Sequence, residues 1–226
     1  AIGLALLRLG ADPNAALFDA LISRLRQARR YEKLLDSMAS YAPRLTLAKA
    51  SGDQTRLEQI RQWAQLVAAS GAQRALVVVD YMQKIPVQRE HIPPGMEHIT
   101  YLANGLKEIA MTLELRILAL AAADRRGLQA ARMRFHDLEG SAAIQYESDV
   151  GAVLNSKYEI VSREHMVYNP AQAQAMRNWV VLSIEKNRAG VNAVDVEFEL
   201  DAAHFHLLPV GRFVRERLID DKVVLA

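Results

Sequence analysis

The stretch that decides the fold reads Ala75-Leu76-Val77-Val78-Val79-Asp80-Tyr81-Met82-Gln83. Its run of consecutive apolar residues shows no polar alternation, and this pattern predicts a strand buried on both faces, as in a parallel sheet. The run ends at Asp80, and open α/β sheets bind their ligands at the carboxyl ends of such strands. Asp80 is therefore a candidate ligand-binding residue, and a core strand that ends in a turn aspartate is the alternative interpretation.

Helix and strand patterns alternate on both sides of this strand. A strand candidate at 45–48 and an amphipathic helix near 57–67 precede it, and a helical pattern over 96–113 leads into a second strand at 116–120. Further strand patterns follow at 150–154, 179–184, 194–200 and 205–208. Such alternation indicates an α/β fold with a mostly parallel central sheet flanked by helices, and the last strands predict carboxy-terminal antiparallel pairing. We expect one domain over residues 1–226.

Composition limits the possible classes of function. The chain has 226 residues, no cysteine, and a net charge of +2 from 28 basic and 26 acidic residues. The lack of cysteine excludes disulfides and cysteine-ligated metal centres, and the near balance of charge means that any nucleic-acid contact must come from a local patch. Neither a run of about 18 apolar residues nor a signal-peptide pattern occurs, so we expect no membrane span and a cytoplasmic setting.

Three stretches, taken in order, resemble one known family. The first is Val77 to Gln83; the second is the helical pattern Ile99 to Leu113 with the strand after it and the loop Asp124-Arg125-Arg126; the third is Glu185-Lys186-Asn187-Arg188-Ala189-Gly190, followed by Val194 to Phe198. Together they resemble the carboxy-terminal RecA-like motor domain of replicative DnaB-type DNA helicases. The resemblance spans nearly the whole chain and implies a RecA-like P-loop NTPase fold with ATP and Mg²⁺ as cofactors.

The resemblance also implies roles for single residues. Asp80 would hold Mg²⁺, directly or through water. Lys186 and Arg188 would reach the nucleotide site of a neighbouring subunit and stabilise charge on the γ-phosphate, which requires a ring, expected to be a homo-hexamer. The alternative interpretation of Lys186 and Arg188 is a basic turn at the end of a strand.

A second group of basic residues lies in the loop after the strand at 116–120. By the resemblance, this loop would line a central channel and contact the phosphates of single-stranded DNA, since clustered arginines suit contacts that carry no sequence preference. An ordinary charged surface loop is the alternative. The residues are Arg125, Arg126, Arg132 and Arg134.

The chain departs from the family in its phosphate-binding parts. No Gly-x-x-x-x-Gly-Lys-[Ser/Thr] sequence occurs, and none of its lysines follows a glycine. A P-loop wraps the β- and γ-phosphates in backbone N–H groups and places a lysine on their charge. The strand with the glutamate that activates the attacking water is also missing. We expect both parts to lie before residue 1, because the chain begins at alanine inside an apolar helical pattern.

Two further departures lie inside the chain. Ala121-Ala122-Ala123 stands where the family has a polar Ser-Gln, and Glu139 stands where the family has an arginine that contacts the DNA backbone. An alanine side chain cannot hydrogen-bond phosphate, and a glutamate repels it. These residues keep a second hypothesis open, a non-catalytic RecA-like module with a regulatory or interaction role. A RecA-like ATPase of the recombination or circadian-clock type is a third possibility, although Tyr81 and Gln83 favour the helicase branch.

Overall fold

The computed structural model describes residues 23–24, 26–27, 31–52, 54–71, 74–93, 96–161, 170–204 and 206–219. The apolar helical pattern at the start of the chain lies outside these residues, as does the first residue of the strand expected at 205–208. The described elements are, in chain order, α3 (Tyr31–Ala39), η1 (Ala42–Arg44), α4 (Leu57–Ala69), β1 (Leu76–Val79), η2 (Met82–Lys84), η3 (Arg89–His91), α5 (His98–Thr112), β2 (Arg116–Ala119), η4 (Gly127–Gln129), η5 (Phe135–Asp137), α6 (Ser141–Glu147), β3 (Val150–Ser156), α7 (Lys157–Ile160), α9 (Pro170–Ala175), η6 (Met176–Asn178), β4 (Trp179–Asn187), β5 (Val194–Asp201) and β6 (His206–Phe213).

The chain divides into two compact units, one formed by residues 1–49 and 200–208 and the other by residues 50–199 and 209–226. In the first unit, α3 and η1 precede residues 45–48, for which the sequence predicts a strand. That prediction is wrong: these residues have no regular structure and are exposed. A strand forms only where a neighbouring backbone takes up its N–H and C=O groups, and no strand pairing is found for residues 45–48 in the described chain.

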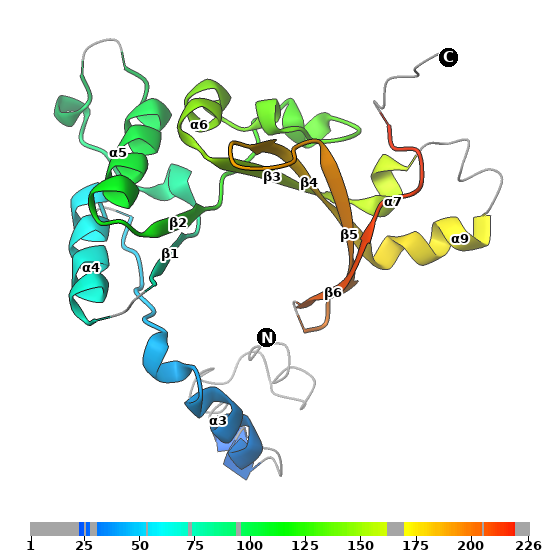
Figure 1. Cartoon of the computed structure of the whole chain (residues 1–226), viewed down its shortest axis with the longest axis horizontal. Helices are drawn as coiled ribbons and strands as arrows, with labels where there is room; N and C mark the ends of the chain where they lie inside the picture. Colours follow the sequence, from blue (N-terminus) through cyan, green and yellow to red (C-terminus); the bar gives the residue numbers. More distant parts are fainter. Residues whose placement is uncertain are drawn as a thin grey trace. The chain divides into compact units, whose positions relative to one another are not determined.

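The larger unit contains a βαβ element made of β1, α5 and β2 (Figure 1). The two strands pair in parallel, from Leu76 opposite Arg116 to Val79 opposite Ala119. Helix α5 supplies the connection, and its apolar positions recur at helical spacing, which places them on one buried face: Ile99, Leu102, Ala103, Leu106 and Ile109. The sequence prediction of two parallel strands joined by a helix is therefore confirmed.

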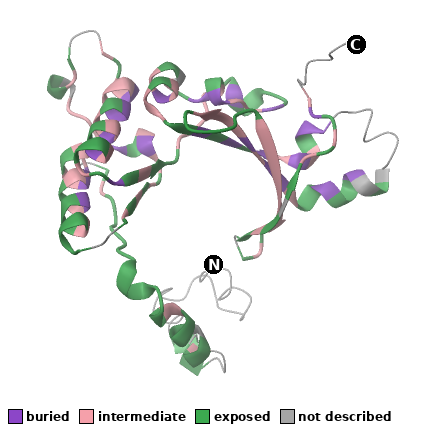
Figure 2. Ribbon diagram, viewed as in Figure 1, coloured by how far each residue is buried: buried purple, intermediate pink, exposed green. Residues whose placement is uncertain are grey.

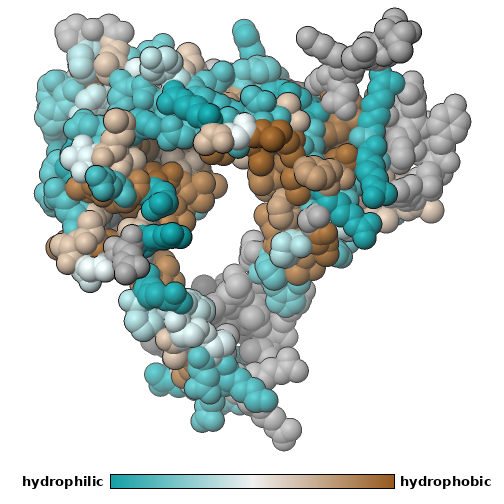
Figure 3. Space-filling view, viewed as in Figure 1, coloured by the Kyte–Doolittle hydropathy of each residue, from teal (hydrophilic) through white to brown (hydrophobic). Residues whose placement is uncertain are grey.

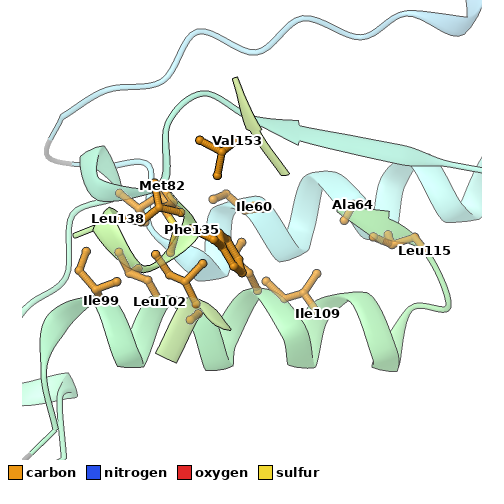
Figure 4. Close-up of a cluster of buried hydrophobic side chains, with 14 residues drawn as sticks. Ile60, Ala64, Met82, Ile99, Leu102, Ile109, Leu115, Phe135, Leu138 and Val153 are labelled. Atoms are coloured by element: carbon orange, nitrogen blue, oxygen red, sulfur yellow. The ribbon is translucent and has the colours of Figure 1, made fainter. Parts of the chain in front are cut away.

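The main hydrophobic core lies between this βαβ element and its neighbours. Figure 4 shows side chains from α4, α5 and η5 converging in it, together with Met82 after β1 and Val153 from β3. The buried positions follow α4 and α5 as a stripe in Figure 2. Leu102 at the centre is 0% exposed. Because the core joins the parallel strands to β3, it fixes the carboxyl ends of β1 and β2 relative to the rest of this unit.

One face of the parallel sheet is open, which corrects the prediction of burial on both faces. Val77 and Val79 pack on the core, whereas Leu76 and Val78 are 61% and 55% exposed. On the neighbouring strand Leu118 is 53% exposed. Figure 3 shows apolar surface at this sheet. Side chains of a strand alternate between the two faces, and in the described chain the core packs on one face only.

We expect Leu102→Ala to lower the free energy of unfolding by about 2–5 kcal/mol, because it leaves a cavity in a filled core. Leu118→Ala is the matched control on the open face and should cost within about 0.5 kcal/mol. Denaturant unfolding followed by circular dichroism measures both variants. Equal losses would mean that the exposed face of the sheet is covered in solution.

A second sheet of four strands, in the order β3-β4-β5-β6, forms the carboxy-terminal part. The β3–β4 and β4–β5 pairs are antiparallel, and a bulge interrupts the first pair between Gly151 and Ala152. The antiparallel prediction is thus confirmed, but a mostly parallel sheet is not found, since the parallel sheet has two strands in the described chain. Among the described residues, no helix is long and apolar enough to cross a membrane.

Candidate active site

Asp80 directly follows β1 and is exposed. Strand pairing continues past it, because Leu120 N donates to Val79 O and Met82 N donates to Leu120 O, both at 2.9 Å. In the described chain, no hydrogen bond or ion pair engages the Asp80 carboxylate, and no group of three or more His, Cys, Asp or Glu side chains could hold a metal. A single free carboxylate fits Mg²⁺, which commonly binds one or two protein carboxylates together with phosphate oxygens and water.

The segment after β2 is held by the side chain of Gln83. Its amide oxygen accepts from Ala122 N at 3.0 Å, and its amide nitrogen donates to Ala122 O at 3.2 Å. This pair of bonds imitates a strand pairing and fixes the backbone of residues 121–123 beside the end of β1. Since the alanine side chains are apolar, only the backbone of this segment can offer polar groups to a ligand.

Lys186 and Arg188 lie at the end of β4, and both side chains fold back onto the end of α6. Lys186 Nζ donates to the carbonyl oxygens of Gln145 and Tyr146, and Arg188 Nη2 also donates to Tyr146 O. The last carbonyls of a helix have no partner inside the helix and carry partial negative charge, so they attract cations.

Asp149 completes this arrangement between two basic side chains. Its carboxylate accepts from Lys107 Nζ at 2.7 and 2.8 Å, and Arg188 Nη1 lies 3.3 Å from the Oδ1 atom. The three cations Lys107, Lys186 and Arg188 around the one carboxylate of Asp149 are called the basic cluster below. The hydrogen bond from Lys107 holds the pKa of Asp149 below its ordinary value. Burial, followed by the nearby charge of Arg188, lowers the pKa of Lys186.

The lowered pKa of Asp149 predicts an acid-dependent contribution to stability. The folded carboxyl titrates below its unfolded value, so the stabilisation is fully present above about pH 4 and is lost as the pH falls through the lowered pKa. We expect the unfolding temperatures of wild type and Asp149→Asn to differ at neutral pH and to converge in acid. Thermal scans at a series of pH values measure this. A difference that stayed constant into acid would contradict the assigned cause.

The loop after β2 separates the predicted DNA-binding arginines into two kinds. Arg125 and Arg126 are exposed, and no ion pair with them is found in the described chain. They lie in the loop that follows the carboxyl end of β2, and Asp80 follows the carboxyl end of the parallel strand β1. Arg134 is partly buried, with its Nε atom 2.9 Å from Glu185 Oε1.

Arg132, which was predicted to contact DNA, is buried and ion-paired. It is 3% exposed, and its Nη2 atom lies 2.8 Å from Asp195 Oδ1 and 3.2 Å from Ser183 Oγ. The loop folds inward here because the amide of Asn155 pairs with the backbone N–H and C=O of Met133, at 3.0 and 2.9 Å. A buried, ion-paired guanidinium has no surface to offer to a phosphate.

Sequence reasoning assigned no role to three residues of this region, Gln83, Lys107 and Asp149. Gln83 and Lys107 lie inside stretches that carry the family resemblance, and Asp149 lies between two of those stretches. Their partners are about forty positions away along the chain: Lys107 to Asp149 spans 42 residues and Gln83 to Ala122 spans 39. A helical or strand period extends over a few residues, so it carries no signal for such pairs.

Comparisons with known proteins give one family match and one likeness of fold. The family described as "DnaB-like helicase C terminal domain" matches residues 20–207. A solved structure described as that of a DnaB-like replicative helicase and its interactions with primase aligns with a TM-score of 0.62 at 17% identity. The alignment covers 80% of this chain and 42% of the other, so the chain spans less than half of that structure. At this identity the likeness shows the fold alone. No curated protein matches the chain.

Proposed function

Because this chain belongs to the family of DnaB-like helicase C-terminal domains, we propose that it is the motor domain of an ATP-dependent DNA helicase. In this proposal the protein forms a homo-oligomeric ring, six-membered as the family resemblance implies, and moves along single-stranded DNA during replication in the cytoplasm. The family match carries the proposal, since it extends over Asp80, the loop after β2 and the turn with Lys186 and Arg188. A primase is a candidate partner, because the similar solved structure is described with one.

The proposal gives a role in ATP hydrolysis to three residues of this chain. Asp80 would hold Mg²⁺, which when bound neutralises charge on the phosphates of ATP. Lys186 and Arg188 would stabilise charge at the nucleotide site of the neighbouring subunit. This sequence contains no P-loop, so the residues present do not by themselves cradle the phosphates of a nucleotide.

Arg125 and Arg126 would contact the DNA backbone. We expect the double variant Arg125→Ala/Arg126→Ala to bind single-stranded DNA more weakly, with similar losses for different sequences. The slope of log K against log salt should fall by about 0.7 for each phosphate that the variant no longer neutralises. Arg74→Ala, which removes an exposed arginine outside this loop, is the control. Fluorescence anisotropy with a labelled oligonucleotide at several salt concentrations gives both the affinity and the slope. An unchanged slope would exclude phosphate contacts by Arg125 and Arg126.

ATP hydrolysis by the complete gene product, with and without single-stranded DNA, tests the proposed function. Hydrolysis that DNA stimulates, and that Asp80→Asn removes, is the expected result. The proposal would be disproved if the same protein, shown by circular dichroism to be folded, hydrolysed no ATP.

The second candidate is a non-catalytic RecA-like module that keeps the fold and assembles with partners. The three alanines at 121–123 favour it, because Gln83 holds their backbone and no polar side chain is available from them beside the end of β1. This candidate predicts assembly that nucleotide does not change. DNA-stimulated hydrolysis would exclude it.

A further inference from the structure

Arg188, in the turn after β4, contacts Asp149 at two points. The backbone N–H of Arg188 donates to the carbonyl oxygen of Asp149 at 2.9 Å, and the Arg188 guanidinium lies 3.3 Å from the Asp149 carboxylate. One residue therefore holds Arg188 at its backbone and at the end of its side chain. A long arginine side chain on an exposed turn has many rotamers, and a second point of attachment reduces that number.

Asp149 is in turn held by α5. Lys107 lies in the middle of this helix, its side chain is 22% exposed, and its Nζ atom contacts both carboxylate oxygens. Helices α5 and α6 lie side by side next to the start of β3 (Figure 1). The apolar face of α5 lies in the same core as Val77 and Val79 of β1. Contacts therefore run from β1 through α5, and then through Lys107 and Asp149, to Arg188.

The pairing of β3 with β4 fixes the backbone next to Asp149. Val150 pairs with Asn187 and Gly151 pairs with Lys186, immediately before the bulge. Bulges redirect side chains and recur beside functional sites. Gly151 is buried, and a Cβ atom there would lie 2.3 Å from the Phe135 ring. The backbone that carries Asp149 thus leads directly into a tightly packed position.

Charge explains why the carboxylate matters. Lys107, Lys186 and Arg188 are like charges, and Asp149 is the acidic side chain that contacts two of them. Without the carboxylate the cations repel one another, and the guanidinium of Arg188 keeps only the helix carbonyl of Tyr146 as a partner among the described residues.

We propose that Asp149 is a positioning residue for Arg188, held in place by Lys107 of α5. The proposal rests on the proposed function, in which Arg188 acts at the neighbour's nucleotide site. Asp149 touches no reacting atom in this account. It keeps the guanidinium aimed in one direction and links that direction to the helix between β1 and β2.

The test uses rings of the complete protein and separates positioning from folding. Asp149→Asn should lower the kcat of ATP hydrolysis about 10- to 100-fold, as a misplaced catalytic group does, while the KM for ATP stays unchanged. Asp149→Glu restores the carboxylate and should recover part of the kcat. Glu108→Gln is the matched control, because it removes an exposed carboxylate beside Lys107 on α5 that pairs with Arg61 instead. It should leave kcat unchanged.

Mixed rings give a readout that a structural defect would not produce. Asp149→Asn subunits keep Asp80, and Asp80→Asn subunits keep the basic cluster. If Asp149 acts through the neighbour's site, mixing the two variants restores turnover above that of either variant alone. The inference would be overturned if Asp149→Asn kept the wild-type kcat, or if mixed rings showed no recovery of turnover. In either case ATP turnover by wild-type rings would still support the proposed function. No turnover by wild-type rings would remove both.

Discussion

Arg188→Ala is expected to lower ATP turnover by the assembled ring by about 10³-fold or more, with little change in nucleotide affinity. The reason is that an arginine supplied by a neighbouring subunit stabilises charge that is largest in the transition state. Its side chain is 49% exposed, and the guanidinium contacts Asp149 and the end of α6. A steady-state ATPase assay gives turnover, and binding of a fluorescent nucleotide gives affinity.

Two further variants sharpen this test. Arg188→Lys keeps the charge but loses the planar fork of donors, so it should recover only part of the turnover. Arg212→Ala removes another exposed arginine, on β6, and should behave as wild type. Unchanged turnover in Arg188→Ala would show that the turn has no role at a neighbour's site.

Lys157→Ala is expected to lower the free energy of unfolding by about 3–5 kcal/mol, because removing one partner of a buried ion pair leaves uncompensated charge. Lys157 is buried and lies between two carboxylates, with its Nζ atom 2.5 Å from Glu197 and 2.9 Å from Glu216. The ammonium also lies 5.8 Å from the centre of the Trp179 ring. Denaturant unfolding measures the loss.

The control for Lys157 is a more exposed pair of the same kind. Arg61 lies 2.9 Å from Glu108, whose side chain is largely exposed, and Arg61→Ala should cost about 0–1 kcal/mol. Replacing Lys157, Glu197 and Glu216 together by methionine and leucines should restore much of the stability, since no charge is then left unpaired. A triple variant as unstable as Lys157→Ala would mean that packing, rather than charge, explains the loss.

Local pattern was enough to predict most of the elements. The apolar run before Asp80 and the helical spacing over 96–113 led to β1 and α5, and the strands at 116–120, 150–154, 179–184 and 194–200 were found close to their expected bounds. These elements are each specified by residues that are neighbours in the chain. The strand expected at 45–48 failed because its existence depends on a pairing partner, which its own sequence does not supply.

The candidate site was harder to predict, because its geometry depends on contacts between distant segments. The sequence located Asp80 at a strand end and grouped Lys186 with Arg188, and both features are found. It could not distinguish the buried Arg132 from the exposed Arg125, because an irregular loop has no periodic pattern that separates buried from exposed positions. The inward course of this loop depends on Asn155, which lies 22 residues beyond Met133.

The open face of the parallel sheet and the unpaired edge of β1 have a consequence for handling the protein. In the described chain β1 pairs with β2 alone, so its other edge offers unpaired backbone groups beside Leu76 and Val78. Such an edge is a template for adding a strand from another molecule, and exposed apolar side chains favour the same contact. Solutions of this chain should therefore self-associate as concentration rises, and dilution should be the first remedy for precipitation.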